Sequence, residues 1–297
     1  MTDIRMRYFN NLHPAVSMCY FVCVLGLTLA CSHPITVVAS IFGSAMFSWR
    51  LRGTKAFWGT MRFVGPMFIL IALANPLFNH RGVTMLFLLF NQWITLEAIV
   101  YGIISACSLC AVVLWFTCYQ EVMTSDKFLY LFGKIAPATS LLITSTLRFI
   151  PQLQKNAAEI SESQKMLREE DTRLFQKMGT ALRNLSALLT MSMENAVETA
   201  DSMKARGFGN KRRTTFHLFR FDGRDARTLS LVLVLAGICV VARCFGHGNM
   251  EYYPAMTPFM YGTPSITMFI TFAALMLLPS ILEVKEAVVW KSYGLTT

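Results

Sequence analysis

The chain has 297 residues, of which 54% are hydrophobic and only 15% are charged, and its formal net charge is +10. A soluble domain carries about a quarter charged residues, so this composition excludes an ordinary soluble protein and indicates a polytopic membrane protein with a polar insertion. The positive charge requires no nucleic-acid partner, because cytoplasmic loops of membrane proteins face anionic lipid. Nearly all of the eight cysteines lie inside apolar runs, which predicts packing rather than a disulfide or zinc framework.

Apolar runs long enough to cross a bilayer recur along the chain, if shorter runs are accepted at bends. Residues 1–11 carry Arg5 and Arg7 and lead into an apolar run without a small-residue cleavage site, so we expect a retained first span and no signal peptide. We expect the short apolar run at 83–90 to form a partly inserted helix. The predicted spans are residues 15–30, 35–49, 63–78, 98–118, 229–245 and 266–281.

The charges between these runs define an orientation. Basic residues precede the first span, cluster at 50–62 and follow the last span, whereas residues 246–264 hold no Lys or Arg. The positive-inside rule then places both termini in the cytoplasm and predicts about six crossings. We expect three regions: N-terminal transmembrane helices at 1–120, a cytoplasmic helical region at 121–228 and C-terminal transmembrane helices at 229–297.

The polar region is strongly patterned. Residues 121–227 hold more than half of the Lys and Arg and more than half of the Asp and Glu, so nothing beyond Arg148 crosses a bilayer cheaply. Apolar residues nevertheless recur at spacings of three and four, which predicts an amphipathic helix at 172–206, about 50 Å long. A shorter amphipathic helix precedes it, with Pro151 in its first turn. The stripe of the long helix comprises Leu174, Met178, Leu182, Leu185, Leu189, Met193, Ala196, Ala200 and Met203.

Two interpretations of these amphipathic helices stay open. They pack against the chain's own spans or lie on the bilayer surface, as helices with basic faces often do, or they dock a partner in water. The tip of the long helix favours a partner, because Arg206 offers a planar fork of donors while Ala205 and Gly207 keep the neighbouring bulk small. The glycines on both sides of Phe208 predict a helix stop and not a phosphate cradle.

Short motifs, in order along the chain, resemble one family of membrane proteins. They are Leu12-His13-Pro14 before the first span, Asn75-Pro76-Leu77-Phe78 at the end of the third, Ile94-Thr95-Leu96-Glu97-Ala98 with Tyr101-Gly102 at the start of the fourth, Leu147-Arg148-Phe149-Ile150-Pro151, and Met203-Lys204-Ala205-Arg206-Gly207. Together they resemble the transmembrane T component of energy-coupling factor (ECF) importers, the EcfT/CbiQ-like family.

The resemblance implies an all-α membrane scaffold with long cytoplasmic coupling helices at 121–228, which is not an enzyme and holds no cofactor or metal. In that family the T component links a membrane-embedded S component, which binds the substrate, to two cytoplasmic ATPases or to one fused ATPase. Each coupling helix docks an Ala-Arg-Gly-type tip on one ATPase. The resemblance implies a multi-pass protein of a bacterial or archaeal cell membrane and leaves cobalt, nickel and vitamins open as substrates.

The first coupling motif departs from the family's pattern. Counted from Pro151, the Arg of the motif falls at Leu167 and its Gly at Arg168. One residue is about 100° of rotation on a helix, so Arg168 points elsewhere unless the helix end unwinds. Lys165 or Arg168 is the expected substitute. The expected ATPase-coupling residues are therefore Lys204, Ala205, Arg206, Gly207, Lys165 and Arg168.

Three other functions are weighed against this one. A permease subunit of another ABC importer class needs an EAA-type loop, but Glu159 and Glu162 lack its small-residue and Gly context. A membrane enzyme needs paired acids, a nucleophile with a base or metal ligands, whereas the predicted spans hold almost no ionisable groups. The third alternative is a membrane-surface scaffold without a transport role. The chain also has no G-x-x-x-x-G-K-[ST] phosphate loop, so it is not expected to bind ATP by that route. For Glu97 two interpretations stay open, a buried functional carboxylate and a carboxylate at the membrane interface.

Overall fold

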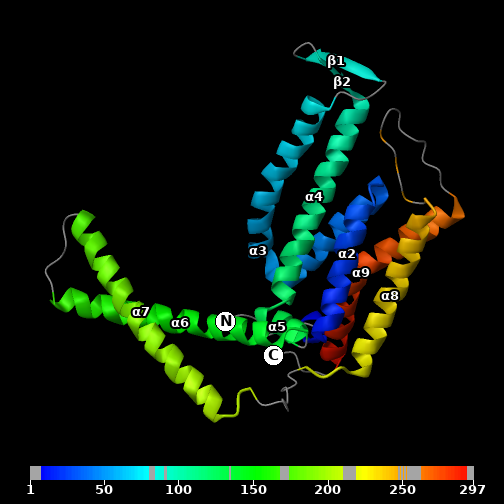
Figure 1. The fold of residues 1–297 in the computed structure, drawn as a ribbon. Coiled ribbons are helices and arrows are strands. Elements are labelled where there is room, and N and C mark those ends of the chain that lie inside the picture. Colours follow the sequence, from blue (N-terminus) through cyan, green and yellow to red (C-terminus); the bar gives the residue numbers. More distant parts are fainter. Residues whose placement is uncertain are drawn as a thin grey trace. The chain divides into compact units, whose positions relative to one another are not determined.

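The computed structural model describes residues 8–79, 84–89, 92–133, 135–167, 174–209, 219–246, 248, 250, 252 and 262–292 (Figure 1). The chain forms two compact units, Met1–Phe128 with Phe219–Thr297, and Leu129–Leu218. One boundary between them falls within helix α5 (Ser125–Gly133), and the other falls between residues 218 and 219. The described elements are helical apart from one hairpin, which confirms the predicted all-α class.

The first unit holds the apolar helices. They are α1 (Tyr8–Asn11), α2 (Pro14–Ala30), α3 (Pro34–Phe78), α4 (Leu96–Val122), α8 (Gly223–Cys244) and α9 (Thr263–Ser292). Within the described ranges, α3, α4, α8 and α9 are long and apolar enough to cross a membrane, and α2 is a shorter apolar helix of 17 residues. The spans predicted at 15–30, 98–118, 229–245 and 266–281 each correspond to one of these helices.

The predicted second and third spans belong to a single element. Helix α3 is recorded over 45 residues and is interrupted at Gly53, where φ is 75° and ψ is 173°. A glycine adopts such a positive φ without the steric cost that a side chain would bring. Residues 50–62, predicted as a charged loop, are therefore helical on both sides of this break. The two halves of α3, together with α2, α4, α8 and α9, contain all the predicted spans.

The partly inserted helix predicted at 83–90 is wrong. Strand β1 (Met85–Leu89) pairs antiparallel with β2 (Gln92–Thr95), with Leu89 opposite Gln92 and Leu88 opposite Trp93. Residues 83 and 90 themselves lie outside the described residues. Periodicity does not separate a strand from a helix in such a short apolar run, and the aromatic and β-branched residues of β2 favour the hairpin.

Large aromatic side chains form the core of the first unit. Phe9, Tyr20, Phe47 and Trp115 are at most 1% exposed, and the ring of Phe9 meets those of Tyr20 and Phe47 edge-on, with centroids 5.1 and 5.6 Å apart. The buried polar groups of Tyr20 and Trp115 each have a hydrogen-bond partner, as buried polar groups require. Trp115 Nε1 donates to Ser40 Oγ at 3.0 Å, and Tyr20 Oη donates to the Leu275 carbonyl at 3.3 Å.

Small residues bring the spans into close contact. A Cβ added at Gly43 would lie 2.9 Å from the Cβ and carbonyl oxygen of Met276, so α3 and α9 meet where only a glycine fits. A Cβ added at Gly102 would lie 3.0 Å from the Ala72 carbonyl oxygen and from Asn75 Cβ, which places the start of α4 against the end of α3. These contacts fix how the helices of the first unit pack.

The same His-Pro pair opens two helices. Nδ1 of His13 accepts from the Ala15 backbone N–H at 3.2 Å at the start of α2, and Nδ1 of His33 accepts from the Ile35 N–H at 3.3 Å at the start of α3. A proline follows each histidine at the first helical position, where its missing N–H costs nothing. Each histidine therefore supplies an acceptor to a helix end that would otherwise leave donors unsatisfied.

The second unit contains the amphipathic helices α6 (Pro137–Leu167) and α7 (Leu174–Ala205), which pack together and cross (Figure 1). Helix α7 agrees with the prediction for 172–206. Pro151, expected in the first turn of its helix, instead lies inside α6, because the helix begins at Pro137. A proline inside a helix removes one i→i−4 hydrogen bond, which is why Pro151 favours a helix start over a helix interior. The helix tolerates this loss, so the prediction of a helix start at Pro151 is wrong.

Candidate functional site

The tip of α7 ends in a closed hydrogen-bonded turn. The Phe208 N–H donates to the Met203 carbonyl and the Gly207 N–H donates to the Lys204 carbonyl, both at 2.9 Å. Gly207, two residues past the end of α7, has a φ of 81°, the left-handed conformation that this pair of bonds requires there. The predicted helix stop is therefore confirmed, and the glycine of the Ala-Arg-Gly sequence has a defined structural role.

This turn presents a basic tip to solvent. Lys204, Ala205, Arg206 and Gly207 are all exposed. The Arg206 backbone is anchored, since its N–H donates to the Ser202 carbonyl at 3.1 Å. Its guanidinium contacts no acidic or carbonyl group within the described residues. The tip thus combines a fixed backbone with a planar donor group that is available to an acidic or carbonyl-lined surface.

The corresponding end of α6 is built differently. Lys165 is exposed in the last turn and the helix ends at Leu167. Arg168, the other expected substitute, lies outside the described residues. Figure 1 shows the C-terminal ends of α6 and α7 apart from each other within the second unit. The sequence-predicted residues therefore form two separate places, one at each helix end.

The apolar stripe predicted for α7 is exposed within the second unit. Met178, Leu182, Leu189 and Met193 are 55–71% exposed. Helix α6 adds exposed apolar residues outside this stripe, among them Leu142 at 63% and Ile150 at 50%. Exposed apolar surface on this scale marks a site of interaction with a protein or a membrane.

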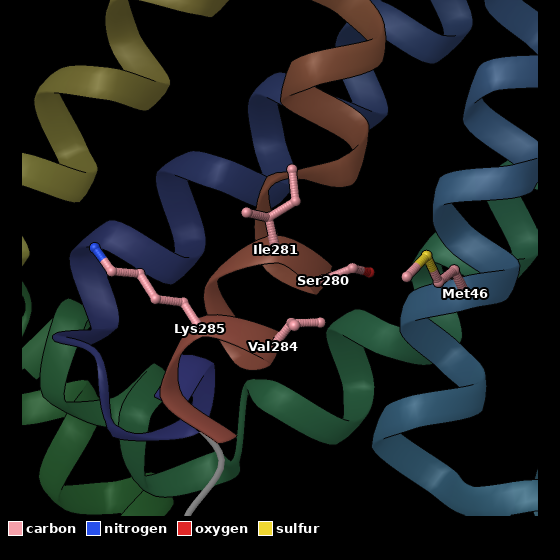
Figure 2. Close-up of a pocket in the computed structure, with 5 residues that line it drawn as sticks. All are labelled: Met46, Ser280, Ile281, Val284 and Lys285. Carbon is pink, nitrogen blue, oxygen red and sulfur yellow. The ribbon is translucent and has the colours of Figure 1, made fainter. Parts of the chain in front are cut away.

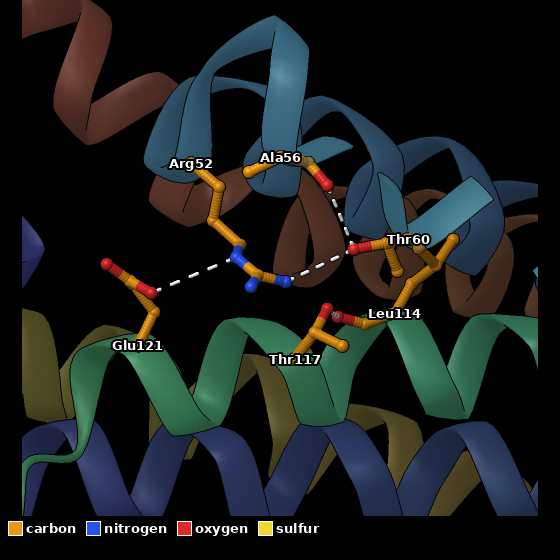
Figure 3. Close-up of polar contacts among 6 residues, drawn as sticks. All are labelled: Arg52, Ala56, Thr60, Leu114, Thr117 and Glu121. Carbon is orange, nitrogen blue, oxygen red and sulfur yellow. Dashed lines mark hydrogen bonds and ion pairs between the residues drawn. The ribbon is translucent and has the colours of Figure 1, made fainter. Parts of the chain in front are cut away.

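A polar link crosses the interruption of α3 (Figure 3). Arg52 Nη1 donates to Thr60 Oγ1 at 3.1 Å, and Thr60 Oγ1 donates to the Ala56 carbonyl at 3.2 Å. Arg52 Nε also lies 3.8 Å from Glu121 Oε2 at the end of α4. One guanidinium thus contacts both halves of α3 and the end of α4. The sequence interpretation treated Arg52 only as loop charge, because its partners are distant in sequence.

Two buried ionisable side chains have structural contacts. Glu97 is 4% exposed and its Oε1 accepts from the Thr84 backbone N–H at 3.2 Å, which ties the start of the hairpin to α4. Glu97 is therefore buried within the protein, and its role as a functional or an interfacial carboxylate stays a prediction. Lys127, which the sequence interpretation missed, is 5% exposed and its Nζ donates to the Val122 carbonyl at 2.9 Å. Burial lowers the pKa of Lys127 to about 8. A lysine shortly after a long apolar helix was the available signal.

An open groove of about 390 Å³ lies between α3 and α9 (Figure 2). Its lining is mostly apolar, with Met46 on α3 and Ile281 and Val284 on α9. Ser280 and Val284 point towards Met46, whereas Lys285 extends away from it. The groove brings together no acid, base and nucleophile set, so it is not a candidate for catalysis. No part of the described chain gathers three or more His, Cys, Asp or Glu into a metal-sized group.

Comparisons with known proteins agree with these features. The model of the CbiQ family, described as a cobalt transport protein, matches residues 9–217. The chain is 29% identical over 107 residues to the energy-coupling factor transporter transmembrane protein EcfT 1 of Listeria monocytogenes, over 35% of this chain and 40% of that protein. It is 30% identical over 113 residues to the EcfT protein of Streptococcus thermophilus, over 37% of this chain and 42% of that protein. The matches span about two-fifths of these curated relatives.

Proposed function

Since the chain belongs to the CbiQ family of cobalt transport proteins, we propose that it is the T component of an ECF-type importer, a non-catalytic membrane scaffold that passes the motion of ATPases to a substrate-binding S component. The resemblance that the sequence motifs carry is confirmed at the level of the family. The partners, the coupling residues and the orientation are parts of the proposal. The substrate class is a transition-metal ion or a vitamin, recognised by the S component.

One observation carries the proposal: the hydrogen-bonded tip of α7 holds Arg206 exposed at the end of a long amphipathic helix. Two cytoplasmic ABC ATPase subunits, or one fused ATPase, are the proposed partners. Lys204, Arg206 and the small residues Ala205 and Gly207 form the second coupling site. Lys165 and Arg168 take the corresponding role at the end of α6. Charge-assisted hydrogen bonds are stronger than neutral ones and geometrically specific. Such donors on a fixed backbone therefore suit a contact that passes motion between subunits.

The exposed apolar surfaces of α6 and α7 are the proposed contact for the S component. A helix that is apolar along one face and polar along the other needs a partner or a membrane for that face. The S component supplies an apolar membrane-embedded surface in this family. Motion that begins at the basic tips is then transmitted along the same two helices to the substrate-binding subunit.

The proposal includes a cell-membrane location with both termini in the cytoplasm. It rests on the basic residues at 50–62 and on residues 246–264, which hold no Lys or Arg. Single reporter cysteines at Ser161, Ser202 and Thr257, in a cysteine-free background, test this orientation. An impermeant reagent added outside intact cells should label only position 257, and labelling at 161 or 202 would overturn the orientation.

The deciding experiment is a charge reversal at the α7 tip. Arg206→Glu should abolish co-purification of the ATPases and substrate uptake, since replacing an attraction by a repulsion at an interface costs about 2–5 kcal/mol. Arg183→Glu is the matched control, because Arg183 is exposed on the same helix but away from the tip. Normal assembly and uptake with Arg206→Glu would show that the tip does not dock an ATPase. A membrane-surface scaffold without a transport role would bind no ATPase in either background.

A further inference from the structure

The second half of α3 carries a basic notch at its beginning. Thr54, Lys55, Trp58, Gly59 and Arg62 line an open pocket of about 330 Å³ on one face of the helix. All five are exposed, and Trp58 is 67% exposed. Gly59 leaves room at the centre of the face, since a Cβ added there would meet no atom within 4 Å. The notch therefore combines two cations, an indole and a hydroxyl around an open space.

The cations of the notch differ from the neighbouring Arg52. Arg52 is engaged by Glu121 and Thr60. Lys55 and Arg62, in contrast, form no ion pair with any acid among the described residues. The carboxylate of Glu121 at the end of α4 is paired with Arg52 instead. Within the described residues the two positive charges of the notch are thus uncompensated, and its ligand should be an anion.

The notch continues into an exposed apolar surface. Counted along the helix from Lys55, Trp58 and Arg62, the same face reaches Ile69 and Leu73, which are 58% and 59% exposed. Helix α3 is long and apolar enough to cross a membrane. Tryptophan and basic residues gather where such helices leave the hydrocarbon layer, because the indole has an apolar body with a polar edge and cations reach the headgroups.

We propose that Thr54, Lys55, Trp58, Gly59 and Arg62 bind the headgroup of an anionic membrane phospholipid. The phosphate group lies between Lys55 and Arg62, Gly59 provides the space that it occupies, and an acyl chain follows Ile69 and Leu73. Charge complementarity and continuity with the apolar face favour a lipid over a soluble acidic protein, which would leave that face uncovered. The proposal does not depend on the ATPase contacts or on the orientation of the chain.

The test compares lipid binding to the full-length protein in detergent by native mass spectrometry. Dioleoyl phosphatidylglycerol is the anionic lipid and dioleoyl phosphatidylcholine is its neutral control. Because each cation near an anionic lipid surface contributes about fivefold in affinity, Lys55→Gln with Arg62→Gln should weaken phosphatidylglycerol binding about 25-fold and leave phosphatidylcholine binding unchanged. Lys155→Gln with Arg183→Gln removes the same charge from the second unit and should have little effect.

A steric variant separates the notch from the net charge. Gly59→Leu fills the space without changing any charge and should also weaken phosphatidylglycerol binding, whereas Gly26→Leu, at another exposed and uncrowded helical glycine, should not. Glycerophosphoglycerol, the headgroup without acyl chains, should fail to displace the lipid. Equal phosphatidylglycerol affinity in the Lys55/Arg62 variant and the control pair would overturn the proposal. So would loss of ATPase assembly with unchanged lipid binding, which would make the notch a protein contact.

Discussion

Arg52 joins the interruption of α3 to the end of α4 through Glu121, with Arg52 Nε 3.8 Å from Glu121 Oε2 (Figure 3). The same guanidinium donates to Thr60, on the far side of Gly53. Because the α3 backbone departs from helical φ/ψ at Gly53, a side-chain link is well placed to hold the two halves at a fixed angle. Both side chains are partly exposed, 31% for Arg52 and 42% for Glu121, which limits the strength of the pair.

We therefore expect a small but measurable coupling between these residues. In a double-mutant cycle with Arg52→Gln and Glu121→Gln, the coupling free energy should be about 0.2–1 kcal/mol and should fall at high salt. Thermal unfolding in detergent at two salt concentrations measures it. Additive effects of the two substitutions on the free energy of unfolding would show that the ion pair contributes nothing to the stability of the α3–α4 contact.

A second prediction concerns the glycine at the tip of α7. Gly207→Ala forces a side chain into the left-handed conformation, which costs about 1–2 kcal/mol. Hydrogen exchange at the Gly207 and Phe208 amides, which bond to Lys204 and Met203, should accelerate, and ATPase pull-down should weaken. Gly179→Ala is the control, since Gly179 lies inside the same helix with open space around it. That change should instead stabilise α7 by about 0.5–1 kcal/mol. Unchanged exchange with Gly207→Ala would contradict the role of this turn.

A third prediction follows from the buried ammonium group at the start of α5. Burial lowers the pKa of Lys127 to about 8, below its value in the unfolded chain. The unfolded state therefore binds more protons between about pH 8 and 10, so the contribution of Lys127 to folding stability rises with pH across this window. The thermal midpoint of the wild type should rise relative to that of Lys127→Met as the pH goes from 8 to 10. Parallel pH profiles for the two proteins would show that Lys127 is not held in a low-dielectric site.

The fourth prediction is an asymmetry between the two coupling sites. Arg206→Ala should impair ATPase assembly more than Lys165→Ala or Arg168→Ala, because α7 ends in an ordered Ala-Arg-Gly turn and the sequence at the end of α6 lacks one. The natural partners should then be two different ATPases or two halves of one fused chain. Pull-down of the ATPases with each alanine variant measures the difference. Equal losses at Arg168 and Arg206 would mean that the slipped motif works normally.

Local sequence patterns predicted the long elements and the tip. The stripe of α7 repeats over enough turns to define a helix, and the glycine after Arg206 indicates where it ends. The errors arose where the signal was short or ambiguous. Pro151 resembles a helix start but lies within α6, and the apolar run at Met85–Leu89 is too short to show its period.

Other features depend on partners far apart in the sequence. Nothing near Arg52 shows that it contacts Glu121, and nothing near Gly43 shows that Met276 passes over it. The two His-Pro pairs are visible in the sequence. They act as caps only because each histidine ring folds back and accepts a hydrogen bond from the first turn of the helix that follows it. Tertiary packing decides these contacts, so a single sequence without its fold does not predict them.

The two His-Pro caps also fix a length. They bracket α2, because His13 opens it and His33 opens the next helix three residues after Ala30. Its 17 residues rise about 26 Å, less than the roughly 30 Å of an average hydrocarbon layer. A helix of this length reaches across the hydrocarbon layer only where the bilayer is thin, so we expect thinning beside α2 and a tilt of the 30-residue α9. Hydrophobic mismatch around this protein is then uneven, and thinner membranes should accommodate it with the least deformation.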